Sequence, residues 1–235
     1  MQREAKLTMT VQRYQIRQCE EIECHFRFPI VEESALGHRC PKCGGKARLI
    51  NVPYAAHEVE IGKFASEGAE IEALLDNIRS VFNVGNMLRT ADGAGIRHMH
   101  LCGITPTPNS PKLAKTALGA ERSVHWTQHR DGLAAAVSLR KQGWRLWALE
   151  GGSRAESLFD ARVDPQGSPI VLVVGSEISG VDPGILEHCE KVLCLPMQGV
   201  KNTLNVAVAF GIAAYFLRFA LAEDKAREVA GSTVI

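Results

Sequence analysis

The feature that most constrains this chain is a run of five apolar residues at 170–174, Ile-Val-Leu-Val-Val, which leads directly into a glycine turn. Gly175, Glu177 and Gly180 form that turn, so it carries a single carboxylate. Strands that are apolar on both faces are typical of a buried parallel sheet, and ligands collect at the carboxyl ends of such strands. The run therefore predicts a buried strand with a binding pocket at its end.

Short apolar runs alternate with helical patterns from Ala69 onward. Strands are expected at 70–75, 99–102, 144–149, 170–174 and 192–195. Helices are expected at 84–92, 131–142, from 182 onward and from 204 to about 223. Strand and helix in alternation predict the α/β fold class with a parallel sheet.

Length and composition set the limits of the domain organisation. A chain of 235 residues with 46% apolar content suits one large domain, or a core domain with a small appendage. We expect a small domain at 1–50, a linker at 51–68 and the main domain at 69–235. The formal net charge is +1, so an anionic partner must be held by a local patch. No apolar run approaches about 18 residues, which argues against a membrane span, and the first residues lack a signal peptide's apolar core.

Four of the seven cysteines cluster near the start of the chain, as Cys19, Cys24, Cys40 and Cys43. Two sulfur pairs on tight turns can hold a structural zinc ion, which would supply folding energy to a segment too short for a large core. His25 or His38 can replace one ligand, and four free, partly buried cysteines are the alternative. Both the metal pattern and the odd cysteine count indicate a reducing cytoplasm rather than a disulfide framework.

The same segment has an excess of basic residues. Residues 1–50 hold nine Lys or Arg and six carboxylates, which leaves about +3. Tyr14, Phe26 and Phe28 are available to stack on bases, so this zinc-ribbon-like domain is a candidate for RNA contact. A solvated, purely structural face is the alternative.

Common phosphate and nucleophile motifs are missing from the sequence. It has no Gly-x-x-x-x-Gly-Lys-Ser/Thr loop, and Gly93 and Gly95 lack the third glycine and preceding strand of a dinucleotide fingerprint. Ser179 stands four residues after Gly175, which is too far for a nucleophile elbow.

A second polar motif lies at the helix expected over 84–92. Asn83 stands where that helix begins, a place that caps helices and binds anions. Arg89 lies on an otherwise small and apolar helix, so it needs an acceptor. The alternative interpretation is an N-cap plus an ordinary ion pair to Asp92 or Glu121.

A third motif follows in residues 193–197, Leu-Cys-Leu-Pro-Met, and 203–206, Thr-Leu-Asn-Val. The three motifs, in their order and spacing, resemble those of the SpoU-type (TrmH) branch of the SPOUT methyltransferases. The first motif is Asn83, Gly85 and Arg89, the second is the Gly-x-Glu-x-x-Gly turn, and the third is formed by these two segments. The resemblance spans about residues 71–221. One departure is Thr203, which replaces the serine usual in the family and keeps the hydroxyl.

The resemblance implies a parallel α/β domain with a deep C-terminal trefoil knot, an exception to the rarity of knots. It implies a homodimer that transfers methyl from S-adenosylmethionine to a ribose 2′-hydroxyl of tRNA or rRNA. The cofactor contacts that it implies are Gly175, Leu195, Leu204, Met197 and Leu149. Plain core packing is the alternative for Leu195 and Leu204.

The resemblance also assigns the reacting groups to Arg89, Asn83, Glu177, Asn205 and Thr203. A guanidinium is an awkward general base because of its high pKa. We therefore expect Arg89 to clamp a phosphate and to stabilise the developing alkoxide. Asn83 is expected to orient the ribose or to hold Arg89, and Glu177 to position RNA or brace Asn205. Thr203 and Asn205 are expected to shape the knot.

Two alternatives to this function remain at the level of sequence. The domain can be a catalytically inactive RNA-binding or assembly factor, although the retained polar residues favour an enzyme. A Rossmann-type methyltransferase is disfavoured because the cofactor-like motifs lie near the C-terminal end. Lys112, Lys115 and Arg122 can grip phosphates or belong to a solvated helix face.

Overall fold

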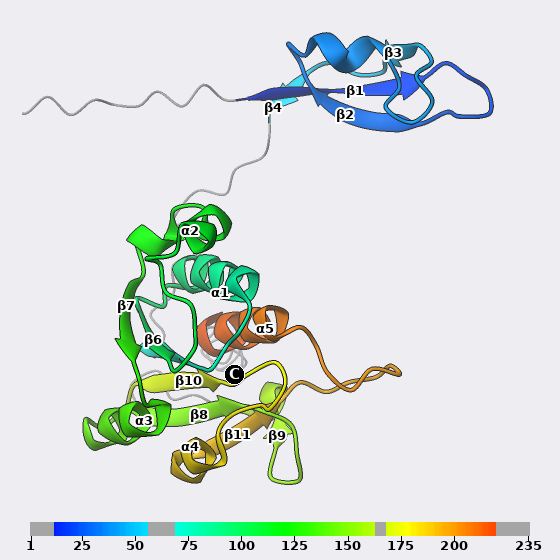
Figure 1. Cartoon of the computed structure of the whole chain (residues 1–235). Coiled ribbons are helices and arrows are strands. Elements are labelled where there is room, and N and C mark those ends of the chain that lie inside the picture. The colour runs from blue at the N-terminus through cyan, green and yellow to red at the C-terminus, as the bar shows by residue number, and fades with distance from the viewer. Residues whose placement is uncertain (1–11, 56–68, 163–167, 220–235) are drawn as a thin grey trace, which may run out of the picture. The chain divides into compact units, whose positions relative to one another are not determined.

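The computed structural model describes residues 12–55, 69–162 and 168–219 (Figure 1). The chain divides into two compact units, Met1–Ala65 and Ser66–Ile235. Most of the linker expected at 51–68, the first eleven residues and the expected end of the last helix near 223 lie outside the described residues. Within the described ranges, no helix is both long and apolar enough to cross a membrane.

The first unit is built on a four-stranded antiparallel sheet. Strand β1 (Arg13–Cys19) lies between β2 (Arg27–Val31) and β3 (Ala47–Leu49), and β4 (Tyr54–Ala55) also pairs with β1. The short 3-10 helix η1 (Ala35–His38) connects β2 with the loop that carries Cys40 and Cys43.

The second unit contains a seven-stranded sheet in the order β7-β6-β5-β10-β8-β11-β9, in which every pairing is parallel. The strands are β5 (Ile71–Asp76), β6 (His98–Cys102), β7 (His125–His129), β8 (Arg145–Leu149), β9 (Glu156–Ser157), β10 (Ile170–Val174) and β11 (Lys191–Cys194). The late strand β10 lies between β5 and β8, with Ile170 opposite both Ile71 and Arg145. The predicted α/β class with a parallel sheet is confirmed.

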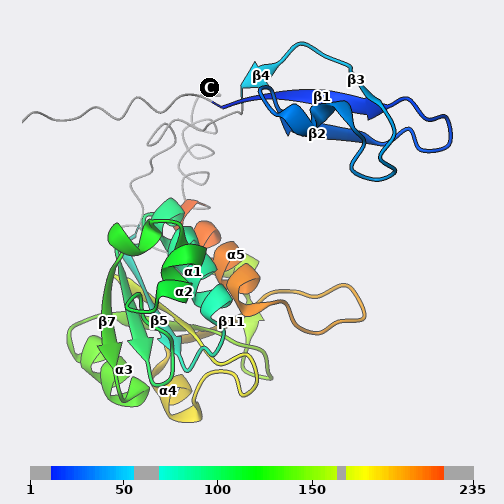
Figure 2. The same cartoon turned by 45° about the horizontal axis from the view of Figure 1, so that its top comes forward.

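Helices cover both faces of this sheet (Figure 2). On one side lie α1 (Val81–Ala94), α2 (Pro111–Ala117) and α5 (Val206–Phe219), and on the other lie α3 (Gly132–Lys141) and α4 (Pro183–His188). Ile170 and Leu172 belong to the core under α1 and α5, whereas Val171 and Val173 belong to the core under α3 and α4. This two-sided burial explains why β10 is apolar at all five positions.

The short 3-10 helices η2 (Ala120–Arg122) and η3 (Leu158–Asp160) complete the second unit. The sequence did not predict β7, because its His-Trp-Thr-Gln-His pattern belongs to a partly exposed edge strand without an apolar run. Helix α1 begins earlier than expected, and the expectation that Asn83 caps it is wrong. Ser80 is the N-cap, and its hydroxyl accepts a hydrogen bond from the Asn83 backbone N–H at 3.3 Å.

Candidate functional site

A cavity of about 460 Å³ lies at the carboxyl ends of β8, β10 and β11. Its walls come from the residues that follow those three strands and from the segment that enters α5. The five residues implied as cofactor contacts all line it: Leu149, Gly175, Leu195, Met197 and Leu204. Glu177, Thr203 and Asn205 line it too. The cavity therefore brings together residues that are up to 60 positions apart along the chain, from Leu149 to Ala209.

Gly175 makes the turn after β10 by a close backbone approach. Ser176 and Gly180 exchange two backbone hydrogen bonds of 3.0 and 2.9 Å, which fold the turn back against the end of the strand. A Cβ at position 175 would collide with the Val181 nitrogen and with the Gly180 carbonyl group. Gly180 itself has φ +73°, a left-handed conformation that glycine adopts without strain.

Replacing Gly175 with alanine is expected to lower the free energy of unfolding of the second unit by about 1–3 kcal/mol, because the new methyl group meets backbone that cannot rotate away. Urea unfolding measures the change. The matched control is Gly199→Ala, since a Cβ there meets no atom within 4 Å. Equal unfolding midpoints for the two variants would show that the close approach does not constrain the turn.

Glu150 is a residue of the cavity that the sequence analysis missed. One carboxylate oxygen accepts the Val181 N–H at 2.8 Å, and the other accepts the Gly151 N–H at 2.9 Å. It therefore ties the loop after β8 to the turn after β10. Its position directly after a buried strand was the one available signal, and a carboxylate there is too common to single it out.

Glu177 joins the turn after β10 to the start of α1. Its carboxylate accepts hydrogen bonds from the Arg79 and Ser80 backbone N–H groups at 2.9 and 3.2 Å and from Asn83 Nδ2 at 2.9 Å. Asn83 Oδ1 in turn accepts from Asn205 Nδ2 at 3.1 Å. One member of each of the three motifs is thus linked in a single chain of hydrogen bonds, which we call the Glu177–Asn83–Asn205 network.

Asn205 also caps the start of α5. Its Oδ1 accepts the backbone N–H groups of Ala207 and Val208 at 2.9 and 3.3 Å, as an N-cap residue does. Both ends of its amide are therefore used, one for the helix and one for Asn83. A change at Asn205 would disturb the cavity wall and the start of α5 together.

The network also sets the ionisation of Glu177. Partial burial alone would raise the pKa of this carboxyl, but the hydrogen bonds from Arg79, Asn83 and Ser80 outweigh it and hold the pKa below its ordinary 4.5. Because the folded-state pKa is the lower one, the charged network stabilises the fold above about pH 4.5. That contribution is lost as the pH falls through the lowered pKa.

Glu177→Gln is therefore expected to lower the unfolding midpoint at neutral pH and to lose this effect at acid pH. Urea unfolding of wild type and variant across a pH series measures the difference. Glu187→Gln, at an exposed position on α4, is the control and should match the wild type throughout. A Glu177→Gln deficit that stays constant down to about pH 3 would contradict this account.

Arg89 lies beside the network rather than in it. Its side chain is on the exposed face of α1, so it does not require an acceptor within the protein. Within the described ranges it has no ion pair, either to Asp92 or to Glu121, which instead accepts the Gly119 N–H at 2.9 Å. Arg89 lines a second depression of about 420 Å³, together with Asn86, Thr90, Asn205, Ala207, Val208 and Tyr215. Asn205 is the residue shared with the first cavity.

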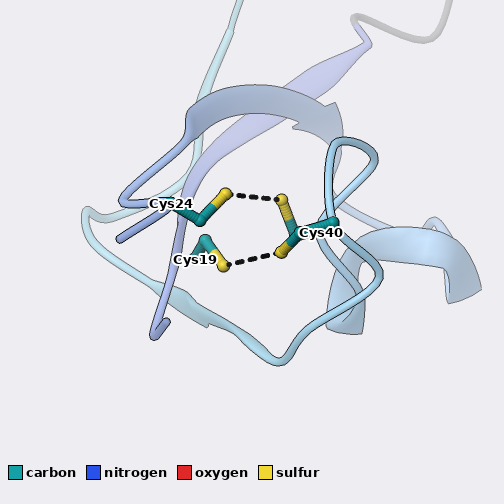
Figure 3. A group of neighbouring side chains, drawn as sticks. Cys19, Cys24 and Cys40 are labelled. Atoms are coloured by element: carbon teal, nitrogen blue, oxygen red, sulfur yellow. Dashed lines mark hydrogen bonds between the residues drawn. The ribbon is translucent and has the colours of Figure 1, made fainter. Parts of the chain in front are cut away.

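The four N-terminal cysteines converge in the first unit (Figure 3). Cys19 Sγ lies 3.4 Å from Cys43 Sγ, and Cys24 Sγ lies 3.8 Å from Cys40 Sγ. All four sulfur atoms lie within 4.8 Å of one another, a spacing compatible with ligands around one tetrahedral ion. The Lys42 N–H donates to Cys40 Sγ and the Gly45 N–H to Cys43 Sγ, both at 3.4 Å.

The two histidines considered as replacement ligands are not members of this cysteine group. His25 is exposed and has φ 43°, and His38 Nδ1 lies 3.4 Å from Arg17 Nη1. The other predicted phosphate-gripping residues, Lys112, Lys115 and Arg122, are exposed on α2 and η2.

Comparisons with known proteins agree on one family. The model of the SpoU rRNA Methylase family matches residues 70–215. The 23S rRNA (guanosine(2553)-2′-O)-methyltransferase RlmP of Bacillus subtilis is 33% identical over 148 residues, which cover 62% of this chain and 56% of that protein. The chain thus spans little more than half the length of this relative.

Solved structures give the same picture. The structure titled "Structural insights into the 2-OH methylation of C/U34 on tRNA" has a TM-score of 0.57 and 30% identity, and covers 66% of this chain and 98% of its own. An AdoMet-bound rRNA methyltransferase from Sinorhizobium meliloti has a TM-score of 0.60 at 22% identity, and covers 72% of this chain and 63% of its own. At 22% identity, the similarity to the Sinorhizobium meliloti structure supports a shared fold and nothing more.

Proposed function

The chain belongs to the SpoU rRNA methylase family, and from this we propose that it transfers a methyl group from S-adenosylmethionine to a ribose 2′-hydroxyl of RNA. The observation that carries the proposal is the Glu177–Asn83–Asn205 network. It links a small-molecule cavity to an adjoining depression that holds Arg89, and Asn205 borders both. A donor of methyl and an acceptor hydroxyl would meet at that border.

The cavity fits S-adenosylmethionine in size and chemistry. About 460 Å³ is within the range of small-ligand sites, and its lining combines the apolar Leu195 and Leu204 with the backbone of the glycine turn. The carboxylates of Glu150 and Glu177 border it, which suits a ligand with a positive sulfonium. The bound cofactor would supply an electrophilic methyl group for an in-line attack by the ribose oxygen.

Arg89 is proposed to act on the RNA. Its guanidinium has five N–H donors, no protein partner in the described ranges and free access to solvent, so it can hold a phosphate and stabilise negative charge on the ribose oxygen. Because a guanidinium group holds its protons too firmly to accept one from a ribose hydroxyl, we assign Arg89 charge stabilisation rather than the role of general base.

The remaining motif residues are proposed to position these groups. Asn83, held by Glu177 and Asn205, would orient the ribose at the border between the two hollows. Thr203 lines the cavity and retains the hydroxyl of the usual serine. We further infer that the turn after β10 and the 197–205 segment belong to a trefoil knot. The insertion of the late strand β10 between β5 and β8 supports this inference.

A homodimer is proposed as the active form. Four large apolar side chains on α1 and α5 are exposed rather than buried: Phe82, Val208, Ile212 and Tyr215. Val208 and Tyr215 border the same depression as Arg89. A second copy that covers this face would complete the RNA site and remove the apolar surface from water.

The first unit is proposed to bind structural zinc through Cys19, Cys24, Cys40 and Cys43 and to contribute RNA contacts. The convergence of the four sulfur atoms and the two N–H···S contacts support the ligand set. Of the aromatic residues expected to stack on bases, Phe28 is buried in the core, so that part of the expectation is wrong, whereas Phe26 is exposed. Exposed Tyr54 offers a further stacking surface. A thiolate site of this kind requires a reducing compartment, so we propose a cytoplasmic location.

The test uses the full chain, S-adenosylmethionine with a labelled methyl group, and tRNA and rRNA from a strain that lacks the protein. We expect calorimetric binding of S-adenosylmethionine and label at a ribose, which makes the adjacent linkage resistant to alkali. Label on a base would contradict ribose specificity. Tight RNA binding without any binding of S-adenosylmethionine would instead identify an inactive RNA-binding or assembly factor.

A further inference from the structure

A second group of metal-ligating side chains lies on β5 and β6, separate from the cavity and from the cysteines. Glu72 is the second residue of β5, and His98 and His100 stand two positions apart on β6. The parallel register pairs Leu74 with His100, so Glu72 lies beside His98. Since alternate residues of a strand project from the same face, all three side chains share one face of the sheet.

These three side chains approach one another closely enough to share an ion. His100 Nε2 lies 2.9 Å from Glu72 Oε2, and His98 Nδ1 lies 3.7 Å from Glu72 Oε1. One ligand atom from each residue lies within 4.8 Å of the other two. Two imidazole nitrogens and one carboxylate oxygen are a ligand set typical of Zn²⁺ and related cations.

The outer nitrogen of each imidazole already has a partner on β7. His98 Nε2 lies 2.9 Å from Thr127 Oγ1, and His100 Nδ1 lies 3.0 Å from His129 Nε2. Histidines that bind metals generally donate their second N–H to such a partner, which fixes the tautomer. Without an ion, His100 Nε2 is placed to donate to Glu72 Oε2 at 2.9 Å. When the outer nitrogens donate to Thr127 and His129, His98 Nδ1 and His100 Nε2 are left as acceptors that face Glu72, and an ion bound there would take the place of the proton.

The environment of Glu72 favours a cation as well. The Glu72 side chain is 16% exposed, and those of His100 and His98 are 8% and 32% exposed. In the part of the chain that the structure describes, Glu72 pairs with these histidines and with no lysine or arginine. A carboxylate that is largely withdrawn from water requires a compensating charge.

We propose that Glu72, His98 and His100 form a binding site for a zinc-class divalent cation. The ion would tie β5 to β6, while Thr127 and His129 on the edge strand β7 hold the two imidazoles in position. Three protein ligands leave a coordination position for water, and the partial exposure of His98 gives the ion a path to it. The site lies toward the amino ends of the strands, whereas the cavity lies at their carboxyl ends, so the ion would take no part in the methyl transfer proposed for the cavity.

The test is zinc content of the full chain after equilibrium dialysis against Zn²⁺, with the cysteine site loaded. Glu72→Gln and His98→Asn are each expected to retain about one zinc ion per chain fewer than the wild type. His188→Asn, at a histidine on α4 outside the cluster, is the control and should retain the wild-type content. Equal zinc content in Glu72→Gln and the wild type would overturn the proposal.

A second measurement separates this site from the cysteine site. In a Cys40→Ser background, added Zn²⁺ is expected to raise the thermal midpoint of the second unit, because a ligand that binds only the folded state stabilises it. The same shift should vanish when Glu72→Gln is added. Circular dichroism checks that each variant is folded, and a shift that persists without Glu72 would also overturn the assignment.

Discussion

Replacing Arg89 with alanine is expected to reduce methyl transfer by on the order of 10²–10³-fold, the usual cost of removing one donor that stabilises a developing oxyanion. The fold should not change. Arg89 is exposed and has no partner in the described ranges, so its loss leaves no buried group unsatisfied. Initial rates with labelled S-adenosylmethionine and urea unfolding, taken on the same preparations, measure the two effects.

Two further variants sharpen this result. Arg89→Lys keeps the charge but loses the fork of donors, so it should recover only part of the rate. Arg97→Ala removes another exposed arginine, in the turn before β6, and should match the wild type. If Arg89→Ala transferred methyl at close to the wild-type rate with an unchanged fold, Arg89 would not be the stabilising group.

The second large effect is expected in the first unit. If the four cysteines bind zinc as proposed, Cys40→Ser should abolish zinc binding and unfold the small sheet, because a structural zinc ion supplies about 10–16 kcal/mol in small domains of this kind. Among the described residues of this unit, the buried apolar side chains are few: Cys19, Phe28, Cys40 and Ala47. Zinc content and cleavage within residues 12–55 by a protease at low concentration measure the loss.

The control for Cys40→Ser is Cys189→Ser in the second unit. Cys189 is buried and donates to the Ile185 carbonyl at 3.3 Å, a bond that a serine hydroxyl can keep. This variant should retain full zinc content and an intact first unit. Full metal occupancy in Cys40→Ser would exclude Cys40 from the ligand set.

The sequence predicted those elements whose burial is visible as a pattern. Strand β10 is apolar at every position because helices cover both of its faces, so its type and its parallel neighbours could be inferred. Strand β7 could not, since an edge strand with exposed residues has no such pattern. The start of α1 was misplaced because Ser80 and Asn83 are both good caps, and only the geometry decides between them.

The candidate site divides in the same way. The resemblance to a family identified residues that line the cavity, because the three motifs can be recognised in the sequence even where the hydrophobic pattern around them is uninformative. Glu150 was missed since its role depends on two backbone N–H groups, one of them 31 positions away. The exposure of Arg89 could not be inferred from its small and apolar helix neighbours, because the exposed face of α1 depends on how α2 and α5 pack.

The position of β10 has a consequence for biosynthesis. Residues 170–174 leave the ribosome after β5, β6, β7, β8 and β9, yet they fill the place between β5 and β8. Until then, β5 presents one unpaired edge and β8 lacks both of its neighbouring strands, so the nascent sheet has no central strand. Pairings over such sequence distances form slowly. The growing chain is therefore expected to be a client of chaperones until β10 and β11 have emerged.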